Sequence, residues 1–225
     1  MKMIITKDDE NLINDIFSKL NKDFVFDKGK LDSKIIIKLI NEIDYFKVYY
    51  NKKADKKIIR LQNKLVKLFK KYEGICHPYE LFKDISYDEN MDRKLQKIAL
   101  DLKYSNLYFA KLFYSKEYWE YSALVLKKRA YPTIGDVILE LFDWLKDINW
   151  PGSMTIKEIL YSIPRDILIK YLEEVIDKAN SIKDFVWLEN LYNFSIELNI
   201  KETEFKNKKT SKILNNLDNK NLSTD

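Results

Sequence analysis

Four carboxylates recur at helical spacing in the C-terminal half of the sequence. Asp136, Glu140, Asp143 and Asp147 are separated by 4, 3 and 4 residues, which places them on one face of a helix. Like charges at these separations repel by about 0.2–0.5 kcal/mol per pair, so the arrangement favours a compensating basic group. Glu140, Asp143 and Asp147 are therefore candidate contacts for a basic partner. A neighbouring helix or water would also satisfy them, and Thr133 with Asp136 fits a capping box at the helix start.

A second stripe carries the opposite charge, and its members also step by 3 or 4 residues. It consists of Lys53, Lys57, Arg60, Lys64, Lys67 and Lys71. These basic-face candidates lie beside an apolar stripe on the same predicted helix. Such a face can bind phosphates or an acidic partner surface, or it can be a solvated face whose lysine stems cover the edge of the core. The solvated face is the favoured interpretation, because no aromatic residues suited to base stacking alternate with the lysines.

The third candidate is an aromatic junction that runs from Trp144 to Pro151. Its two tryptophans, Trp144 and Trp150, are candidate partner contacts together with the acidic stripe. The structural interpretation is favoured here. Asp147 and Asn149 are suited to satisfying backbone groups in a turn, and Trp150 is suited to filling the space between neighbouring helices.

The remaining composition excludes several kinds of site. The single cysteine, Cys76, cannot form an internal disulfide or a cysteine-based zinc site, and the single histidine, His77, excludes a two-histidine metal site. We expect no metal and no cofactor, and we assign the Cys76-His77 pair to a structured turn. The net charge of +5 is unevenly distributed. Residues 52–71 hold nine basic and one acidic residue, whereas residues 131–199 hold six basic and twelve acidic residues.

The elements that position these residues are predicted to be helices throughout. The chain has only 4 Gly and 4 Pro among 225 residues, too few for the turns of a sheet-rich fold. Apolar residues recur at helical spacing along most of it, including the stripe from Phe185 and Val186 to Leu198. We predict an all-α fold of stacked antiparallel helix pairs, either a HEAT-like α-solenoid or an irregular helical bundle. The predicted parts are an N-terminal region (1–74) with the basic helix, a helical domain (75–200), and a polar, frayed tail (201–225).

The segment Trp144-Leu145-Lys146-Asp147-Ile148-Asn149-Trp150-Pro151 resembles a bacterial family described only as a domain of unknown function. The resemblance covers roughly residues 125–200, and Gly152-Ser153-Met154-Thr155 departs from the usual small and apolar helix formers that follow the proline. It implies a helical fold related to HEAT-type repeats, and no established activity.

Two functional hypotheses from different classes follow. The first is a non-enzymatic helical-repeat protein that binds another protein, one form of which is a toxin-neutralising, immunity-like role. The alternative is a HEAT-like nucleic-acid-binding or DNA-repair glycosylase-like protein, in which Arg129, Asp143, Trp144 and Trp187 would act and the basic helix would hold phosphates. No stretch is long and apolar enough for a membrane span or a signal peptide, so we expect a cytoplasmic protein. The sequence leaves the oligomeric state open.

Overall fold

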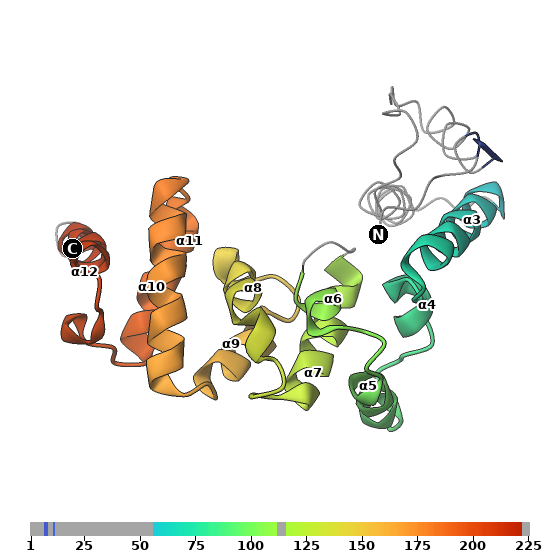
Figure 1. Cartoon of the computed structure of the whole chain (residues 1–225), viewed down its shortest axis with the longest axis horizontal. Coiled ribbons are helices and arrows are strands. Elements are labelled where there is room, and N and C mark those ends of the chain that lie inside the picture. The colour runs from blue at the N-terminus through green and yellow to red at the C-terminus, as the bar shows by residue number, and fades with distance from the viewer. Residues whose placement is uncertain (1–6, 9–10, 12–55, 112–115, 222–225) are drawn as a thin grey trace. The chain divides into compact units, whose positions relative to one another are not determined.

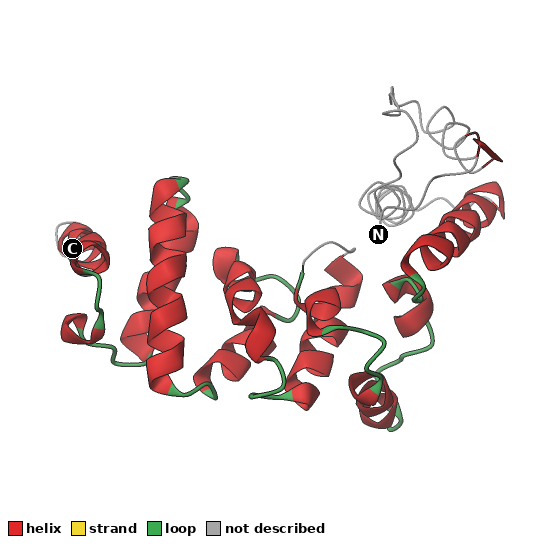
Figure 2. Cartoon of the chain, viewed as in Figure 1, coloured by secondary structure: helices red, strands yellow, loops and turns green. Residues whose placement is uncertain are grey.

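The computed structural model describes residues 7, 8, 11, 56–111 and 116–221, and every regular element within them is a helix (Figures 1 and 2). The predicted all-α class is confirmed, while the HEAT-like stacking stays a prediction. None of the described helices is long and apolar enough to cross a membrane. The helices predicted before residue 55, together with Lys53, lie outside the described residues.

The chain divides into two compact units. The first comprises Met1–Ser86 with Phe113–Tyr118, and the second comprises Tyr87–Leu112 with Trp119–Asp225. The chain thus passes between the units after residues 86, 112 and 118. The domain boundary at residue 74 stays a prediction.

The first unit is organised by α3, α4 and the short helix η1. Their bounds are Lys56–Glu73, Pro78–Phe82 and Lys116–Tyr118. Apolar residues of α3 at helical spacing form a buried face: Leu65, Val66, Leu68 and Phe69. Helix α3 ends at Gly74, whose φ of +71° supplies the left-handed residue that commonly ends a helix. His77 then caps α4, because its Nδ1 accepts a hydrogen bond from the Tyr79 N–H at 3.1 Å.

The second unit is a succession of helices around a core rich in aromatic rings. Trp144, Trp187, Phe109, Phe142 and Phe194 are fully buried in it. Helix α7 packs against α5, α6 and α9, and α10 packs against α11 and α8. The elements are α5 (Met91–Leu100), α6 (Asn106–Ala110), α7 (Trp119–Arg129), η2 (Gly135–Val137), α8 (Ile138–Phe142), η3 (Asp143–Lys146), α9 (Ser153–Tyr161), α10 (Arg165–Ser181), α11 (Phe185–Glu197), η4 (Glu202–Glu204) and α12 (Lys208–Asn221).

The segment after Ile200 corrects the prediction of a frayed tail. It forms η4 and α12, and α12 packs on α10 and α11. Two of its apolar residues, Phe205 and Leu214, are buried and anchor it. Arg165 fixes the connection: its guanidinium forms two hydrogen bonds to the Glu204 carboxylate, at 2.7 and 2.8 Å, and donates to the carbonyls of Leu198 and Asn199. The hydrogen bonds that Glu204 accepts, first from Arg165 and then from the Lys201 N–H at 2.8 Å, lower the pKa of its carboxyl to about 2.

Candidate functional site

The aromatic junction is part of the core of the second unit. The Trp144 ring is fully buried, and its Nε1–H donates to the Ala110 carbonyl at 2.8 Å. The Trp119 ring lies 6.0 Å from it and meets Trp150 edge-on at 5.1 Å. Trp144 cannot present its ring to a partner, so it is removed from the candidate contacts. Trp150 is half-buried and packs beside Trp119.

Asp147 has the turn-forming role that the sequence favours. Its Oδ1 accepts a hydrogen bond from the Asn149 N–H at 2.9 Å, and its carbonyl accepts from the Trp150 N–H at 3.1 Å. The Asp147 side chain thus forms an Asx-turn, which fixes the connection between η3 and α9. Ser153 completes the junction by donating its hydroxyl to the Trp144 carbonyl at 2.9 Å.

The acidic stripe does not lie on one helix. The predicted helix is divided into η2, α8 and η3, and 3₁₀ turns advance side chains by a different angle from an α-helix, so the 4-3-4 spacing no longer marks one face. Asp136 accepts from the Asn106 amide at 2.6 Å instead of closing a capping box with Thr133. Asp143 pairs with Lys146 at 2.8 Å and with Lys178 at 3.4 Å. Glu140 is half-buried.

Asp143 belongs to a cluster that closes over a buried tryptophan. The Lys146 and Lys178 ammonium groups lie 4.4 and 5.3 Å from the centre of the Trp187 ring. The indole N–H of Trp187 donates to the Phe142 carbonyl at 3.1 Å. Two cation–π contacts and one shared carboxylate therefore tie η3, α10 and α11 together. The arrangement gives Asp143 and Trp187 a structural role.

Arg129 uses its guanidinium as a clamp on the α5–α6 connection. It donates to the carbonyls of Ala99, Asp101 and Tyr104 at 2.9, 3.0 and 2.6 Å, and to Asn106 Oδ1 at 2.8 Å. Burial lowers the pKa of Arg129, although the carboxylates of Asp101 and Asp136 act in the opposite direction. The glycosylase-like hypothesis places Arg129 in the site, but in the structure its donors bind three backbone carbonyls and the Asn106 side chain of the same unit.

Replacing this clamp should destabilise the second unit. We expect Arg129→Lys to lower its free energy of unfolding by about 2 kcal/mol, because lysine cannot reproduce the planar fork and leaves carbonyls without donors. Urea unfolding followed by tryptophan fluorescence measures the loss. Arg93→Lys is the matched control, since Arg93 is exposed on α5. Equal stability of the two variants would contradict the clamp.

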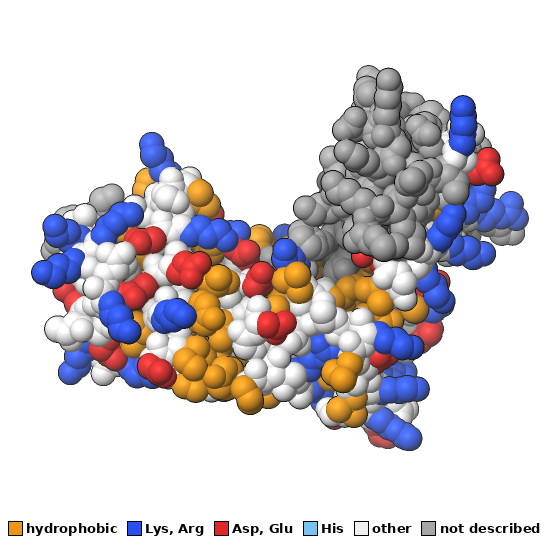
Figure 3. Space-filling view, in the orientation of Figure 1, with side chains coloured by type: hydrophobic (Ala, Val, Ile, Leu, Met, Phe, Trp, Pro, Cys, Tyr) orange, Lys and Arg blue, Asp and Glu red, His pale blue; other side chains and the backbone are white. Residues whose placement is uncertain are grey.

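The basic stripe is exposed wherever its side chains are described. Arg60, Lys64, Lys67 and Lys71 all lie on the exposed side of α3, and Lys57 belongs to the same helix. Figure 3 shows Lys and Arg side chains gathered over this element.

The structure also shows an exposed apolar cluster that sequence reasoning missed. Ile182, Phe185 and Val186, here named the hairpin tip, lie where α10 turns into α11 and are 58%, 62% and 64% exposed. The prediction that Phe185 and Val186 join the apolar stripe of the helix is wrong. The sequence contains a sign of this exposure, since Phe185 and Val186 begin a run of four consecutive apolar residues. At 100° per residue along a helix, the side chains of such a run cannot all face one core.

Comparison with known proteins places a family domain on this second unit. Residues 120–223 match the model of a domain of unknown function, DUF5071. No curated protein and no solved structure matches the chain. The match agrees with the predicted resemblance to a domain of unknown function and extends past residue 200 through α12. The Trp-Leu-x-Asp-x-Asn-Trp-Pro signature and the HEAT-like repeat stay predictions.

Proposed function

We propose that this protein acts by binding another protein, without catalysis, and that the hairpin tip is its contact surface. The observation that carries the proposal is the exposure of three large apolar side chains within five residues. Single exposed apolar residues are ordinary, whereas clustered ones mark interaction sites.

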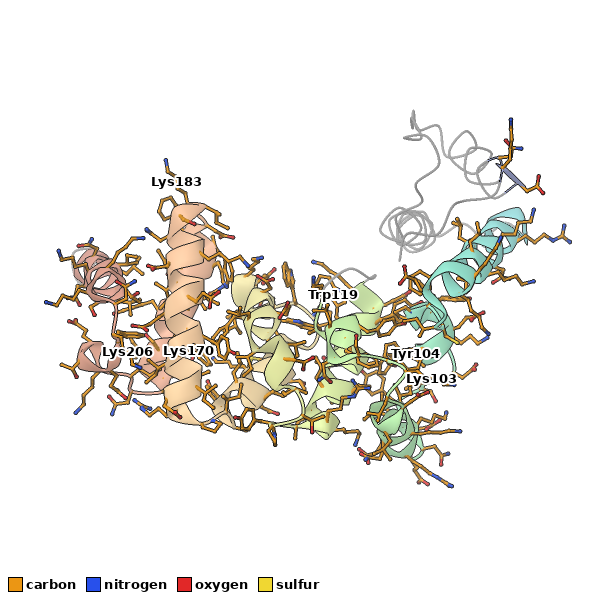
Figure 4. The ribbon with its side chains drawn as sticks, in the orientation of Figure 1. Lys103, Tyr104, Trp119, Lys170, Lys183 and Lys206 are labelled. Carbon is orange, nitrogen blue, oxygen red and sulfur yellow. The ribbon has the colours of Figure 1, made fainter. Side chains whose placement is uncertain are left out.

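The tip is exposed because α10 and α11 are longer than α8, against which α10 packs. Helix α10 has 17 residues and α11 has 13, whereas α8 has 5. At a rise of about 1.5 Å per residue, α10 extends well beyond α8, and the α10–α11 pair projects accordingly (Figure 1). The turn at the tip is tight, with Lys183 at φ +58° and the Asp184 carboxylate capping the Trp187 N–H at 3.1 Å. Figure 4 shows Lys183 at this end of the pair.

The chemistry of the tip defines the kind of partner. Burial of a large apolar side chain stabilises a complex by about 1.5–3 kcal/mol, and Phe185 is the largest of the three. An apolar cleft would accept the ring, while the Lys183 ammonium would stay at the polar rim. Three side chains cover less than the roughly 800 Å² per partner of a standard interface, so the tip acts as the anchor of a wider contact.

The residues whose side chains are best suited to catalysis are used to stabilise the fold, which supports a binding role over a catalytic one. Asp143, Asp147 and Arg129 are each engaged in contacts that stabilise the fold. A toxin-neutralising, immunity-like role is one form of this function. It predicts a neighbouring toxin gene whose product is inhibited on binding.

Polar substitution of the tip should weaken the interaction. A photo-crosslinking amino acid at position 185 identifies the partner in the native host, and the purified partner is then titrated with the full chain. We expect Phe185→Ser with Val186→Ser to weaken binding at least tenfold, because the anchor no longer enters the apolar cleft.

Met154→Ser with Ile196→Ser is the matched control. These residues are 61% and 56% exposed, on α9 and at the far end of α11. The proposal fails if both double variants weaken binding equally, or if neither does while circular dichroism shows all chains folded.

A further inference from the structure

The basic face of α3 forms a second surface, in the unit that does not carry the hairpin tip. Arg60, Lys64 and Lys67 are exposed, and the hydrogen bonds and ion pairs of the described residues involve none of the three. Lys71 is exposed one turn further along the same face. The ammonium and guanidinium groups of the first three are therefore available to a ligand.

The core of the first unit fixes the direction of this face. Leu65, Val66, Leu68 and Phe69 are between 0% and 4% exposed and hold one side of α3 against the unit. The cations occupy the opposite side, where Lys and Arg side chains gather (Figure 3). The apolar stripe thus determines that the basic stripe points outward.

The arrangement of charge on α3 is unfavourable without a ligand. Arg60 and Lys64, and Lys64 and Lys67, are separated by 4 and 3 residues, so like charges adjoin along the face. The only acid in the helix is Glu73, its last residue. An anionic partner would remove this repulsion as well as form new contacts.

The shape and chemistry of the face favour a duplex over other polyanions. From Arg60 to Lys71 it extends about 16 Å in a nearly straight row, which suits the dense phosphate charge of a double helix. Between Arg60 and Lys71, the side chains that the structure describes as exposed are Arg60, Asn63, Lys64, Lys67, Lys70 and Lys71, and none of these carries a ring on which unpaired bases stack. We propose that the basic face of α3 docks against the phosphate backbone of double-stranded DNA, independently of base sequence.

Fluorescence anisotropy with the full chain tests this proposal. The probes are a labelled 20-base-pair DNA duplex, a single strand carrying the same number of phosphates, and polyglutamate of equal charge. We expect the duplex to bind most tightly at about 50 mM salt, and its affinity to fall with a log–log salt slope proportional to the number of contacts. Arg60→Gln with Lys64→Gln and Lys67→Gln should weaken duplex binding at least tenfold and reduce the slope by about 2–3.

The control variant removes the same charge elsewhere. Lys97→Gln with Lys206→Gln and Lys212→Gln alters three exposed lysines of the second unit, and it should keep duplex affinity within about threefold. If the two triple variants lose duplex affinity equally, the net charge of the protein explains the binding, and the proposal is overturned. Tighter binding of polyglutamate or of the single strand would also overturn it, in favour of an acidic protein or an unpaired strand. Unchanged circular dichroism shows that both variants are folded.

Discussion

Gly152→Ala is expected to destabilise the second unit by about 3 kcal/mol or more. Gly152 has φ +84°, a conformation that costs other residues roughly 1–2 kcal/mol. An added Cβ would lie 2.8 Å from both Ala123 Cβ and Trp144 Cζ3, and 3.0 Å from the Trp119 carbonyl oxygen. These atoms belong to the core and to the backbone, so relief would require repacking that costs roughly another 1–3 kcal/mol.

Urea unfolding followed by tryptophan fluorescence measures this loss. All four tryptophans, Trp119, Trp144, Trp150 and Trp187, belong to the second unit, so the signal reports that unit alone. Gly135→Ala is the matched control, because an added Cβ there meets only Tyr131 Cε2 at 3.9 Å, an ordinary contact. If the two alanine variants unfold at the same urea concentration, the close packing around Gly152 is refuted.

Acidification should unfold the first unit through His77. Burial lowers the pKa of this imidazole from 6.5 to about 3, and the ring is fully buried against Phe69. Between these values the unfolded chain binds a proton that the folded chain excludes. The contribution of neutral His77 to the free energy of unfolding of the first unit is therefore fully present above pH 6.5. It falls by about 1.4 kcal/mol per pH unit as the pH decreases from 6 towards 3. Hydrogen exchange of the α3 and α4 amides, corrected for the intrinsic pH dependence of exchange, measures the loss from pH 7 to 5.

His77→Asn provides the control for this titration. The asparagine side chain accepts the capping hydrogen bond from the Tyr79 N–H and does not titrate. Every carboxylate of the unit is retained, so the difference in pH dependence between the two chains belongs to the imidazole. An identical decline of protection in both would assign the acid sensitivity to other groups.

The sequence was informative where local pattern decides structure. The 3–4 spacing of apolar residues predicted helices because such spacing aligns side chains on one face whatever the tertiary fold. Asp147 is a turn residue, as its sequence context predicts, because its side-chain hydrogen bond reaches only two residues along the chain.

Long-range contacts account for the predictions that failed. The predicted acidic stripe does not form, because its residues are divided among η2, α8 and η3. Distant partners hold two of them: Lys178 lies 35 residues from Asp143, and Asn106 lies 30 residues from Asp136. The sequence predicts a frayed tail instead of a C-terminal helix because the segment is largely polar, and Phe205 and Leu214 become core residues only where it packs against α10 and α11. Exposure of the hairpin tip depends on the relative lengths of helices, which no local periodicity encodes.

The hydrogen bonds between Arg165 and Glu204 show that the folded part of the second unit continues past Ile200. A fragment stopping at Ile200, where the polar composition begins, would keep Arg165 but lose the Glu204 carboxylate that neutralises it. It would also uncover the parts of α10 and α11 on which α12 packs. A fragment of the second unit therefore needs η4 and α12, because this polar last helix covers surface of α10 and α11.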